Sequence, residues 1–465
     1  MVSSGAKRIC RTFLLIILMR DYTSALAPQT SLFLPGDARS AGSGSWNSPA
    51  IWERFDGVTW RPAATSPDSS FGTITIRSGH IVTMTMPLVY NQVVVESGAQ
   101  VVVAAGVTHV LSDGPGTDLT IEGVWLNQGG TWTVIGNARW AVTSTGVFIH
   151  HTTSGISTPL SKATLSPGST FTYRGGSALV PSSTFAGKTY GSLRFESVGG
   201  PYSISASGST SLVIVGDLVI GGGVKWNTGG FTGNITVRGS TVIEGEWGGS
   251  GTAAFGVHTF EGHFSLTPGG KYTLSTTAAQ SGPIVFKGDM RCGSTLALPK
   301  GRLAEFSGFD QQTLEGPANI VLGGGAVARA VLNISQGSTI ELGAQQKIVL
   351  HADLMNAGQI VGADSLTLLQ LSDTCSMVTN NGSVLVPALF DSAESVRSVT
   401  GNGTWTTIIV PRQSSVRFSG MHTFAGAGSS LDVRGSAIFE EGSSIKYQGP
   451  LRQEISPQSY ADLVI

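Results

Sequence analysis

Two acidic residues separated by one position, Glu244 and Glu246, form the best catalytic candidate in this chain of 465 residues. Residues two apart in a β-strand point to the same face, so both carboxylates would share one face of a strand. Glycoside cleavage uses two facing carboxylates, and Trp247 follows directly as a ring on which a sugar could stack. The alternative is an exposed acidic rung of the coil beside Gly245, because acidic side chains are mostly solvated. We favour this alternative and assign no catalytic residue.

Tryptophan rings are candidates for carbohydrate binding because they are large and flat. Trp46, Trp52 and Trp60 stand close together near the N-terminus. Trp247 beside the acidic pair is the fourth candidate. Large aromatic side chains are usually buried for packing, so we favour a structural role for the first three, as the core of a cap.

The histidines and cysteines predict neither a metal centre nor a cofactor. His150 and His151 are adjacent and would diverge on a strand, so one metal ion would not bind both. We favour a turn at this point. Cys292 and Cys375 lack the Cys/His spacing of a zinc site. In an oxidising compartment they could form a disulfide, and the alternative is two buried free thiols in separate coils.

A short recurring phrase indicates the scaffold that would position these residues. It consists of two polar residues, glycine, two small or polar residues and the apolar start of a strand. A turn glycine followed by an alternating strand, repeated in this way, is typical of stacked β-coils that bury their apolar side chains against one another. The copies are residues 96–101, 166–171, 267–272, 291–296, 335–340 and 440–445.

A longer phrase, Gly-x-His-Thr-Phe-x-Gly, contains His258 in one copy and His422 in another. Recurrence within a repeat favours structure over catalysis. We therefore expect both histidines at a fixed corner of the coil.

The composition fits a compact β protein. Charged residues make up only 12% of the chain and apolar residues 40%, mostly in short alternating runs, which argues against disorder. Short strands between Gly, Asn and Asp turns fit a β-sandwich or a parallel β-helix. Asn-Gly dipeptides, which hairpins would need at most turns, are scarce. We therefore predict an all-β, right-handed parallel β-helix, with helical patterns limited to the first 20 residues and 388–396.

The chain divides into three segments. Residues 1–27 have the basic, apolar and small-residue regions of a secretory signal peptide. Residues 28–70 form a tryptophan-containing cap, and residues 71–465 form the solenoid body. The apolar core of the leader is too short to span a bilayer, so we expect no transmembrane segment in the mature chain. Residues 445–465 match residues 171–195 and stop within a strand, so we expect the protein to continue beyond Ile465.

The charge balance argues against nucleic acid as a partner. Without the leader, the chain carries 24 basic and 28 acidic residues and no basic cluster. Nucleic-acid binding depends on clustered Lys and Arg that neutralise phosphates.

The segment 45–52, followed by 74–83, resembles a large group of secreted, adhesin-like bacterial surface proteins. Their repeats read W-x-x-P-x-x-W, then V-x-I-x-x-G-x-x-V-T, then L-x-V-x-x-G-A-x-L-x-V. The same opening is similar to the eight-glycine domain of some extracellular hyaluronan-degrading and ciliary proteins. The resemblance implies a right-handed β-helix body on an extracellular or cell-surface protein.

Two functions remain open from the sequence. The first is an exported structural or adhesive protein that presents a polar lateral surface to glycans or other surface proteins through weak, multivalent contacts. The second is a β-helix enzyme that processes polysaccharide as a lyase or glycosidase. A groove that gathers three or more Asp, Glu, Lys, Arg or His residues would favour the enzyme, and an even polar surface would favour the first.

Overall fold

A computed structural model describes residues 33–251 without a break, residues 254–448 with short gaps, and residues 463–464. The predicted signal peptide, residues 1–27, lies outside the described residues. The gaps are 252–253, 277–281, 295, 298–302, 309–310, 317–318, 323–330, 345–346, 351–352, 363–367, 372–374, 376, 391–395, 413, 426–429, 435 and 449–462.

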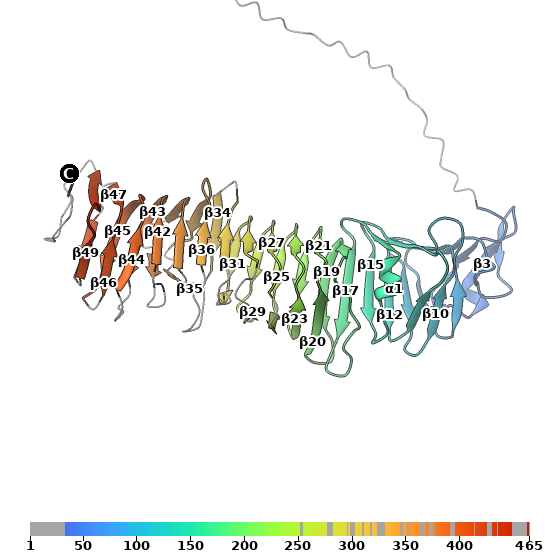
Figure 1. Cartoon of the computed structure of the whole chain (residues 1–465). Coiled ribbons are helices and arrows are strands. Elements are labelled where there is room, and N and C mark those ends of the chain that lie inside the picture. The colour runs from blue at the N-terminus through green and yellow to red at the C-terminus, as the bar shows by residue number, and fades with distance from the viewer. Residues whose placement is uncertain are drawn as a thin grey trace, which may run out of the picture.

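The chain folds into an elongated, nearly all-β parallel solenoid of about 14 turns (Figure 1). Most strands pair in parallel with their counterparts on the coils before and after them. Val93, for example, stands in register with Ile74 on one side and with Leu119 on the other. The predicted stack of β-coils is therefore confirmed, and its right-handed sense stays a prediction.

The strands form three columns along the axis, which we call A, B and C. Column A contains β1 (Ala38–Ser40), β5 (Ile74–Ile76), β8 (Val93–Val95), β11 (Leu119–Ile121), β14 (Trp140–Val142), β16 (Ala163–Leu165), β18 (Thr189–Tyr190), β21 (Leu212–Ile214), β24 (Ile235–Val237), β27 (His258–Phe260), β30 (Ile284–Phe286), β33 (Leu303–Phe306), β36 (Val331–Ile334), β39 (Asp353–Asn356), β42 (Met377–Asn380), β44 (Val396–Thr400), β46 (Ser415–Phe418) and β49 (Ser436–Phe439).

Column B contains β2 (Gly44–Ser45), β6 (Ile81–Met84), β9 (Gln100–Val103), β12 (Val124–Gln128), β15 (Val147–His151), β17 (Thr170–Gly175), β19 (Ser192–Ser197), β22 (Leu218–Ile220), β25 (Thr241–Ile243), β28 (Phe264–Leu266), β31 (Met290–Cys292), β34 (Gln311–Glu315), β37 (Thr339–Leu342), β40 (Gln359–Gly362), β47 (Met421–Ala425), β50 (Ser444–Gln448) and β51 (Leu463–Val464).

Column C contains β7 (Leu88–Tyr90), β10 (Thr108–Leu111), β13 (Thr131–Val134), β20 (Tyr202–Gly208), β23 (Val224–Phe231), β26 (Glu246–Gly251), β29 (Lys271–Thr276), β32 (Leu296–Ala297), β35 (Asn319–Leu322), β38 (Lys347–Leu350), β41 (Leu368–Leu371) and β48 (Ser430–Val433). Two longer strands, β43 (Ser383–Phe390) and β45 (Thr404–Val410), pair with both columns B and C and so pass through the corner between them.

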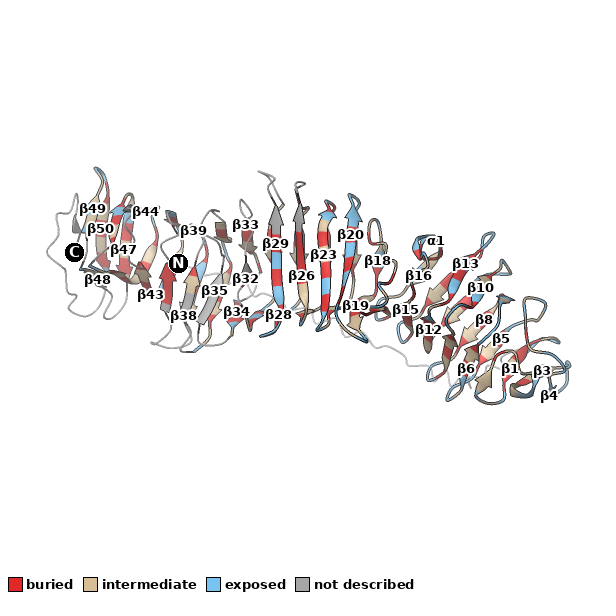
Figure 2. Cartoon of the chain, turned by 90° about the horizontal axis from the view of Figure 1, so that it is seen from below, coloured by how far each residue is buried: buried red, intermediate tan, exposed pale blue. Residues whose placement is uncertain are grey.

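Side chains alternate between the core and the surface along the strands, as the burial colours in Figure 2 show. In β5, Ile74 and Ile76 are buried, whereas Thr75 between them is half-buried. Aromatic rings at equivalent positions stack from coil to coil. The ring of Phe286 lies 5.4 Å from those of Phe260 and Phe306, measured between centroids. This arrangement makes a continuous apolar core that no single coil could bury alone.

The recurring glycine phrase occupies two different corners of the coil. Four copies join column A to column B, and their glycines have φ between +79° and +89°, a conformation that glycine adopts without strain. The copies at 267–272 and 291–296 join column B to column C, and their third residues, Gly269 and Gly293, do not have positive φ. One sequence pattern thus serves two turn geometries.

Other corner glycines are required because neighbouring coils pack closely. A Cβ atom on Gly146 would lie 2.1 Å from the carbonyl oxygen of Ile121 on the preceding coil. A Cβ on Gly155, in the turn after β15, would have no heavy atom within 4 Å.

We expect Gly146→Ala to lower the free energy of unfolding by about 2 kcal/mol or more, because the added methyl group overpacks against backbone. Gly155→Ala is the matched control and should be neutral or stabilising by about 0.4–1 kcal/mol. Urea unfolding followed by circular dichroism measures both. Equal stabilities for the two variants would contradict this account of coil spacing.

The first coil is covered by antiparallel strands. β3 (Trp52–Phe55) pairs antiparallel with β1 and with β4 (Trp60–Pro62), after a single 3-10 turn, η1 (Pro49–Ile51). β1 in turn pairs parallel with β5 of the first regular coil. This hairpin extends column A and shields the open edge of the stack.

The columns are interrupted once, between the N-terminal coils and the longer C-terminal body. In column A, β16 and β18 are not paired with each other and belong to different sheets. Column C has no strand between β13 and β20. A short helix, α1 (Ser157–Ser161), takes the place of a strand there and contacts β13. Column B alone continues its ladder through this region, from β15 through β17 and β19 to β22.

One expectation about local structure is wrong. His258 and His422 do not lie at a fixed coil corner but are fully buried in strands β27 and β47, where inward-pointing positions alternate with outward ones. Of the helical pattern at 388–396, residues 388–390 belong to β43 and Val396 begins β44, whereas residues 391–395 lie outside the described residues.

Candidate functional site

Glu244 and Glu246 do not share one strand. β25 ends at Ile243 and β26 begins at Glu246, so the pair spans the corner between columns B and C. Glu244 is exposed and Glu246 is half-buried. The argument that both side chains lie on one strand face is therefore wrong, because Gly245 marks a turn.

The corner nevertheless brings both glutamates into one open groove of about 460 Å³. We call it the Glu246 groove. It crosses four coils and is lined by Pro201, Tyr202, Ser203, Gly223, Val224, Lys225, Glu244, Gly245, Glu246, Gly269 and Lys271.

Charged side chains form a ladder across the Glu246 groove. Lys225, Glu246 and Lys271 occupy the same register position on β23, β26 and β29. The Nζ of Lys225 lies 2.6 Å from Oε1 of Glu246, and the hydroxyl of Thr273 donates a hydrogen bond of 2.9 Å to the same oxygen. Opposite charges on adjacent strands stabilise such a pair.

These contacts set the protonation state of Glu246. Partial burial raises the pKa of its carboxyl group, but the hydrogen bonds from Lys225 and Thr273 and the charges of Lys225 and Lys271 outweigh this, so the pKa lies below its usual 4.5. Glu246 is therefore an ionised hydrogen-bond acceptor near neutral pH. A glycosidase acid needs the opposite shift.

We expect Lys225→Met to raise the pKa of Glu246, because both the strongest donor and the nearest positive charge are lost. The free energy of unfolding should fall by less than about 1 kcal/mol, as is usual for partly exposed ion pairs. NMR titration of the Glu246 side-chain carboxyl measures the pKa, and Lys347→Met, outside the groove, is the control. An unchanged pKa in Lys225→Met would contradict the ladder.

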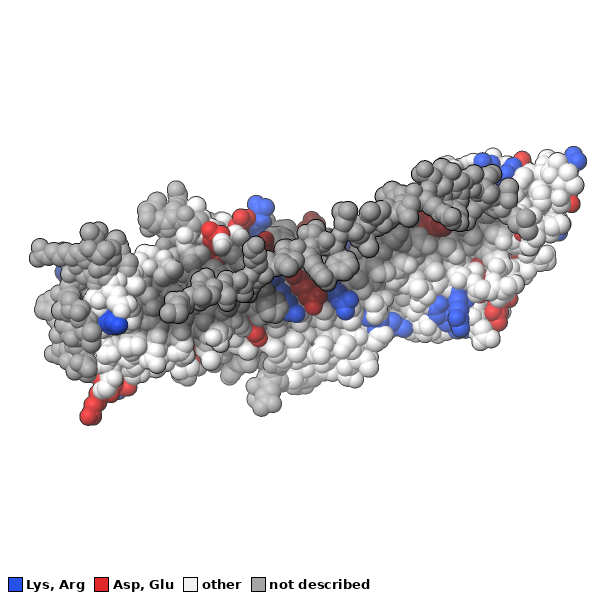
Figure 3. All heavy atoms as spheres, turned by 90° about the horizontal axis from the view of Figure 1, so that it is seen from above, with Lys and Arg blue, Asp and Glu red and all other residues white. Residues whose placement is uncertain are grey.

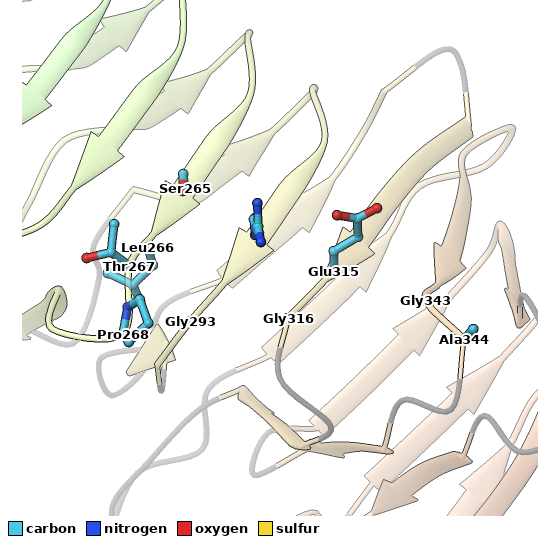
Figure 4. A pocket seen from close by; sticks show the side chains of 10 residues that line it. Ser265, Leu266, Thr267, Pro268, Gly293, Glu315, Gly316, Gly343 and Ala344 are labelled. Atoms are coloured by element: carbon cyan, nitrogen blue, oxygen red, sulfur yellow. The ribbon is translucent and has the colours of Figure 1, made fainter.

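A second depression, of about 750 Å³, lies farther along the axis. We call it the Gly293 groove. Figure 4 shows Gly293, Gly316 and Gly343 on successive coils, with Glu315 standing above the gap. Arg291 and Glu315 carry its charges, and both are exposed. The groove is lined by Ser265, Leu266, Thr267, Pro268, Arg291, Gly293, Glu315, Gly316, Gly343 and Ala344.

Charged side chains also occur outside the two grooves. On the face seen from above, the described Lys and Arg residues lie near Asp and Glu in small mixed groups, with uncharged residues between them (Figure 3). Arg174 and Glu196 form an ion pair between adjacent coils, with 2.7 Å between Nη2 and Oε2.

Trp46 and Trp52 form the core of the cap. Both rings are buried and meet edge to face at 5.0 Å. The indole Nε1 of Trp46 donates to the carbonyl oxygen of Pro67, and that of Trp52 donates to the carbonyl oxygen of Trp46. Their position agrees with the structural role that we favour, and it leaves no ring face for a sugar.

Trp247 and Trp60 lie in contrasting places. Trp247 is fully buried in the core, and its Nε1 donates to the hydroxyl of Thr228 at 3.1 Å. It therefore cannot stack on a sugar in the groove outside. Trp60 keeps a partly exposed ring, with the guanidinium carbon of Arg39 at 4.2 Å from its centroid.

Cys292 and Cys375 are two buried free thiols, which is the second of the two sequence alternatives. Burial raises the pKa of each thiol to about 12. In Cys375 the charge of Asp353 adds to this effect and Arg397 opposes it. Neither thiol forms a disulfide, and both are unreactive at neutral pH.

The adjacent histidines lie in strand β15 and not in the expected turn, because this segment pairs with the strands of both neighbouring coils, and their side chains diverge. His150 is buried in β15, whereas His151 is half-buried and its Nδ1 hydrogen-bonds to the carbonyl oxygen of Arg174 at 2.9 Å. Among the described residues, no three His, Cys, Asp or Glu side chains are grouped so as to hold a metal ion.

Within the described part of the chain, no helix has the length and apolar character needed to cross a membrane. Comparisons with known protein families, with curated proteins and with solved structures find no match for this chain. The chain is therefore classified by its fold alone, as a parallel β-solenoid.

Proposed function

We propose that this chain is an exported structural and adhesive protein of the cell surface or extracellular matrix. Its solenoid acts as a stiff spacer and presents a polar lateral surface for weak, multivalent binding to glycans or other surface proteins. The observation that supports this proposal most strongly is the stacking of apolar and aromatic side chains from coil to coil across the described residues. This stacking builds a long body from units too small to fold alone.

Three further features support this proposal. The leader pattern of residues 1–27 favours export. The opening segment resembles those of secreted adhesin-like proteins. The small charge of the outer faces disfavours nucleic acid as a partner and suits shallow contacts made through many Ser and Thr side chains.

The proposal is tested by expression with the leader, followed by analysis of the secreted product. We expect cleavage after Ala25 or Ala27, an elongated particle by small-angle X-ray scattering, and weak binding to several members of a glycan array. Intracellular retention of the intact chain, or an array without any binding, would contradict it.

A polysaccharide-processing enzyme is the second candidate, and a specific observation favours it. The Glu246 groove contains four charged side chains, Lys225, Glu244, Glu246 and Lys271. An enzyme is expected to gather three or more such side chains in one groove. The ion pair of Lys225 with Glu246 is the argument against it, because it helps to hold the pKa of Glu246 below its usual value and so keeps that carboxyl group from acting as a proton donor.

Digestion of polysaccharides, followed by reducing ends and by the absorbance of unsaturated sugars, separates the two candidates. We expect no product. Turnover that disappears in Glu244→Gln would establish the enzyme in place of the spacer.

A further inference from the structure

The two grooves lie on one line. Both follow the corner between columns B and C, and they meet at the turn between β28 and β29. Thr267 and Pro268 of that turn line the Gly293 groove, and Gly269 and Lys271 line the Glu246 groove. Together they form a single trough, which we call the corner trough, along seven successive coils from Tyr202 to Ala344.

Six glycines line the corner trough. They are Gly223, Gly245, Gly269, Gly293, Gly316 and Gly343. Close packing between coils explains some of them, since a Cβ on Gly245 would lie 2.3 Å from the carbonyl oxygen of Val224. Gly269 is different, because a Cβ there would meet only the carbonyl oxygen of Glu244, at an ordinary 3.8 Å. Packing does not require glycine at that point, whereas an open trough does.

The walls of the trough carry equal numbers of positive and negative groups. The positive groups are Lys225, Lys271 and Arg291, and the negative groups are Glu244, Glu246 and Glu315. They follow the coil repeat, because Lys225, Glu246 and Lys271 are in register on adjacent strands, as are Arg291 and Glu315. Positive and negative groups therefore lie on adjacent coils, at the strand spacing of about 4.8 Å, from Lys225 to Lys271 and again from Arg291 to Glu315.

We propose that the corner trough binds one chain of a neutral, linear polysaccharide parallel to the solenoid axis. Sugar hydroxyl groups both donate and accept hydrogen bonds, so they can use ammonium, guanidinium and carboxylate groups in alternation. A polyanion or a polycation would meet three repelling charges in the same trough. The repeat of the coil is comparable to the length of one extended sugar residue, so successive sugars meet similar surroundings. This inference rests on the proposed adhesive function and names its site and its ligand class.

Gly269→Trp tests the site because it fills the trough without a clash at Cβ. Gly155→Trp is the matched control, since a Cβ on Gly155 also has open space and Gly155 lines neither groove. Linear glucan, mannan and xylan oligosaccharides of increasing length are the probes, and polygalacturonate is the charged comparison. Isothermal titration calorimetry on the secreted chain measures affinity.

We expect the affinity for at least one neutral series to rise with length up to about seven sugars and to exceed that for polygalacturonate. Gly269→Trp should weaken binding at least tenfold, and Gly155→Trp should not change it. The double variant Arg291→Met/Glu315→Gln should lower the affinity for long oligosaccharides more than that for short ones, because it removes contacts at one end of the trough.

The possible failures are distinguishable. Equal glycan binding by Gly269→Trp and the wild type would overturn the corner trough and leave the adhesive function standing. Preference for polygalacturonate would also overturn this inference alone. An array without any binding would overturn both.

Discussion

Replacing Trp247 with alanine is expected to lower the free energy of unfolding by about 3–5 kcal/mol. The ring is fully buried, and its centroid lies 4.5 Å from that of Trp226 on the preceding coil. It also stacks on His258 at 5.3 Å. Removal of the indole leaves a cavity that the stacked strands cannot close, because their backbones are fixed by ladders on both sides.

Urea unfolding measures the loss for Trp247→Ala, and hydrogen exchange locates it. Amides of β23, β26 and β29 should exchange faster than those of distant coils, since each coil depends mainly on its neighbours. Trp60→Ala, at a partly exposed ring, is the control and should cost only about 1 kcal/mol. If Trp247→Ala reduced glycan binding and left stability unchanged, the ring would have to face the groove rather than the core.

Acid is expected to unfold the solenoid between about pH 6 and pH 4. Burial lowers the pKa of His109 and His150 to about 3 and that of His422 to about 4, with opposing backbone hydrogen bonds in the last two. The unfolded chain takes up protons near pH 6.5, whereas the folded chain does not. The contribution of these residues to stability is therefore complete above pH 6.5 and is lost as the pH falls, by about 2–3 kcal/mol for each ring by pH 4.

Unfolding midpoints in urea, measured from pH 7.5 to pH 4, test this dependence. His109→Phe should flatten the slope of stability against pH, because one buried imidazole is removed. The variant should be less stable at pH 7, because Tyr90 loses its hydrogen bond to Nδ1 of His109. His263→Gln changes an exposed side chain and should leave the slope as it is. A wild-type midpoint independent of pH over this range would show that the buried rings are hydrated.

Much of the fold could be predicted because coil strands are short and their turns are marked by glycine. The glycine phrases at 96–101 and 335–340, for example, lead into strands β9 and β37, as expected. The helix α1 was missed, since Ser157–Ser161 is too short to show a helical period. The inward position of His258 was missed because its partner, the hydroxyl of Tyr272 at 3.1 Å, belongs to another strand of the coil.

The candidate site could be predicted only in part. Glu244 and Glu246 do lie in one groove, but for a different reason from the one that the sequence suggested. Their spacing predicts a shared strand face, whereas the turn at Gly245 and the register with Lys225 bring them together. Lys225 and Lys271 were missed because they are about 20 residues away on either side, and the coil lengths that align them vary.

The interruption beside α1 has a mechanical consequence. Over most of its described length the protein would share a pulling force along the axis among three hydrogen-bonded ladders, but between β17 and β19 the column B ladder bears it alone. Under tension, rupture should therefore start there and free the N-terminal coils as one intact block. A tether that yields at a fixed point limits the load passed to whatever is attached beyond it.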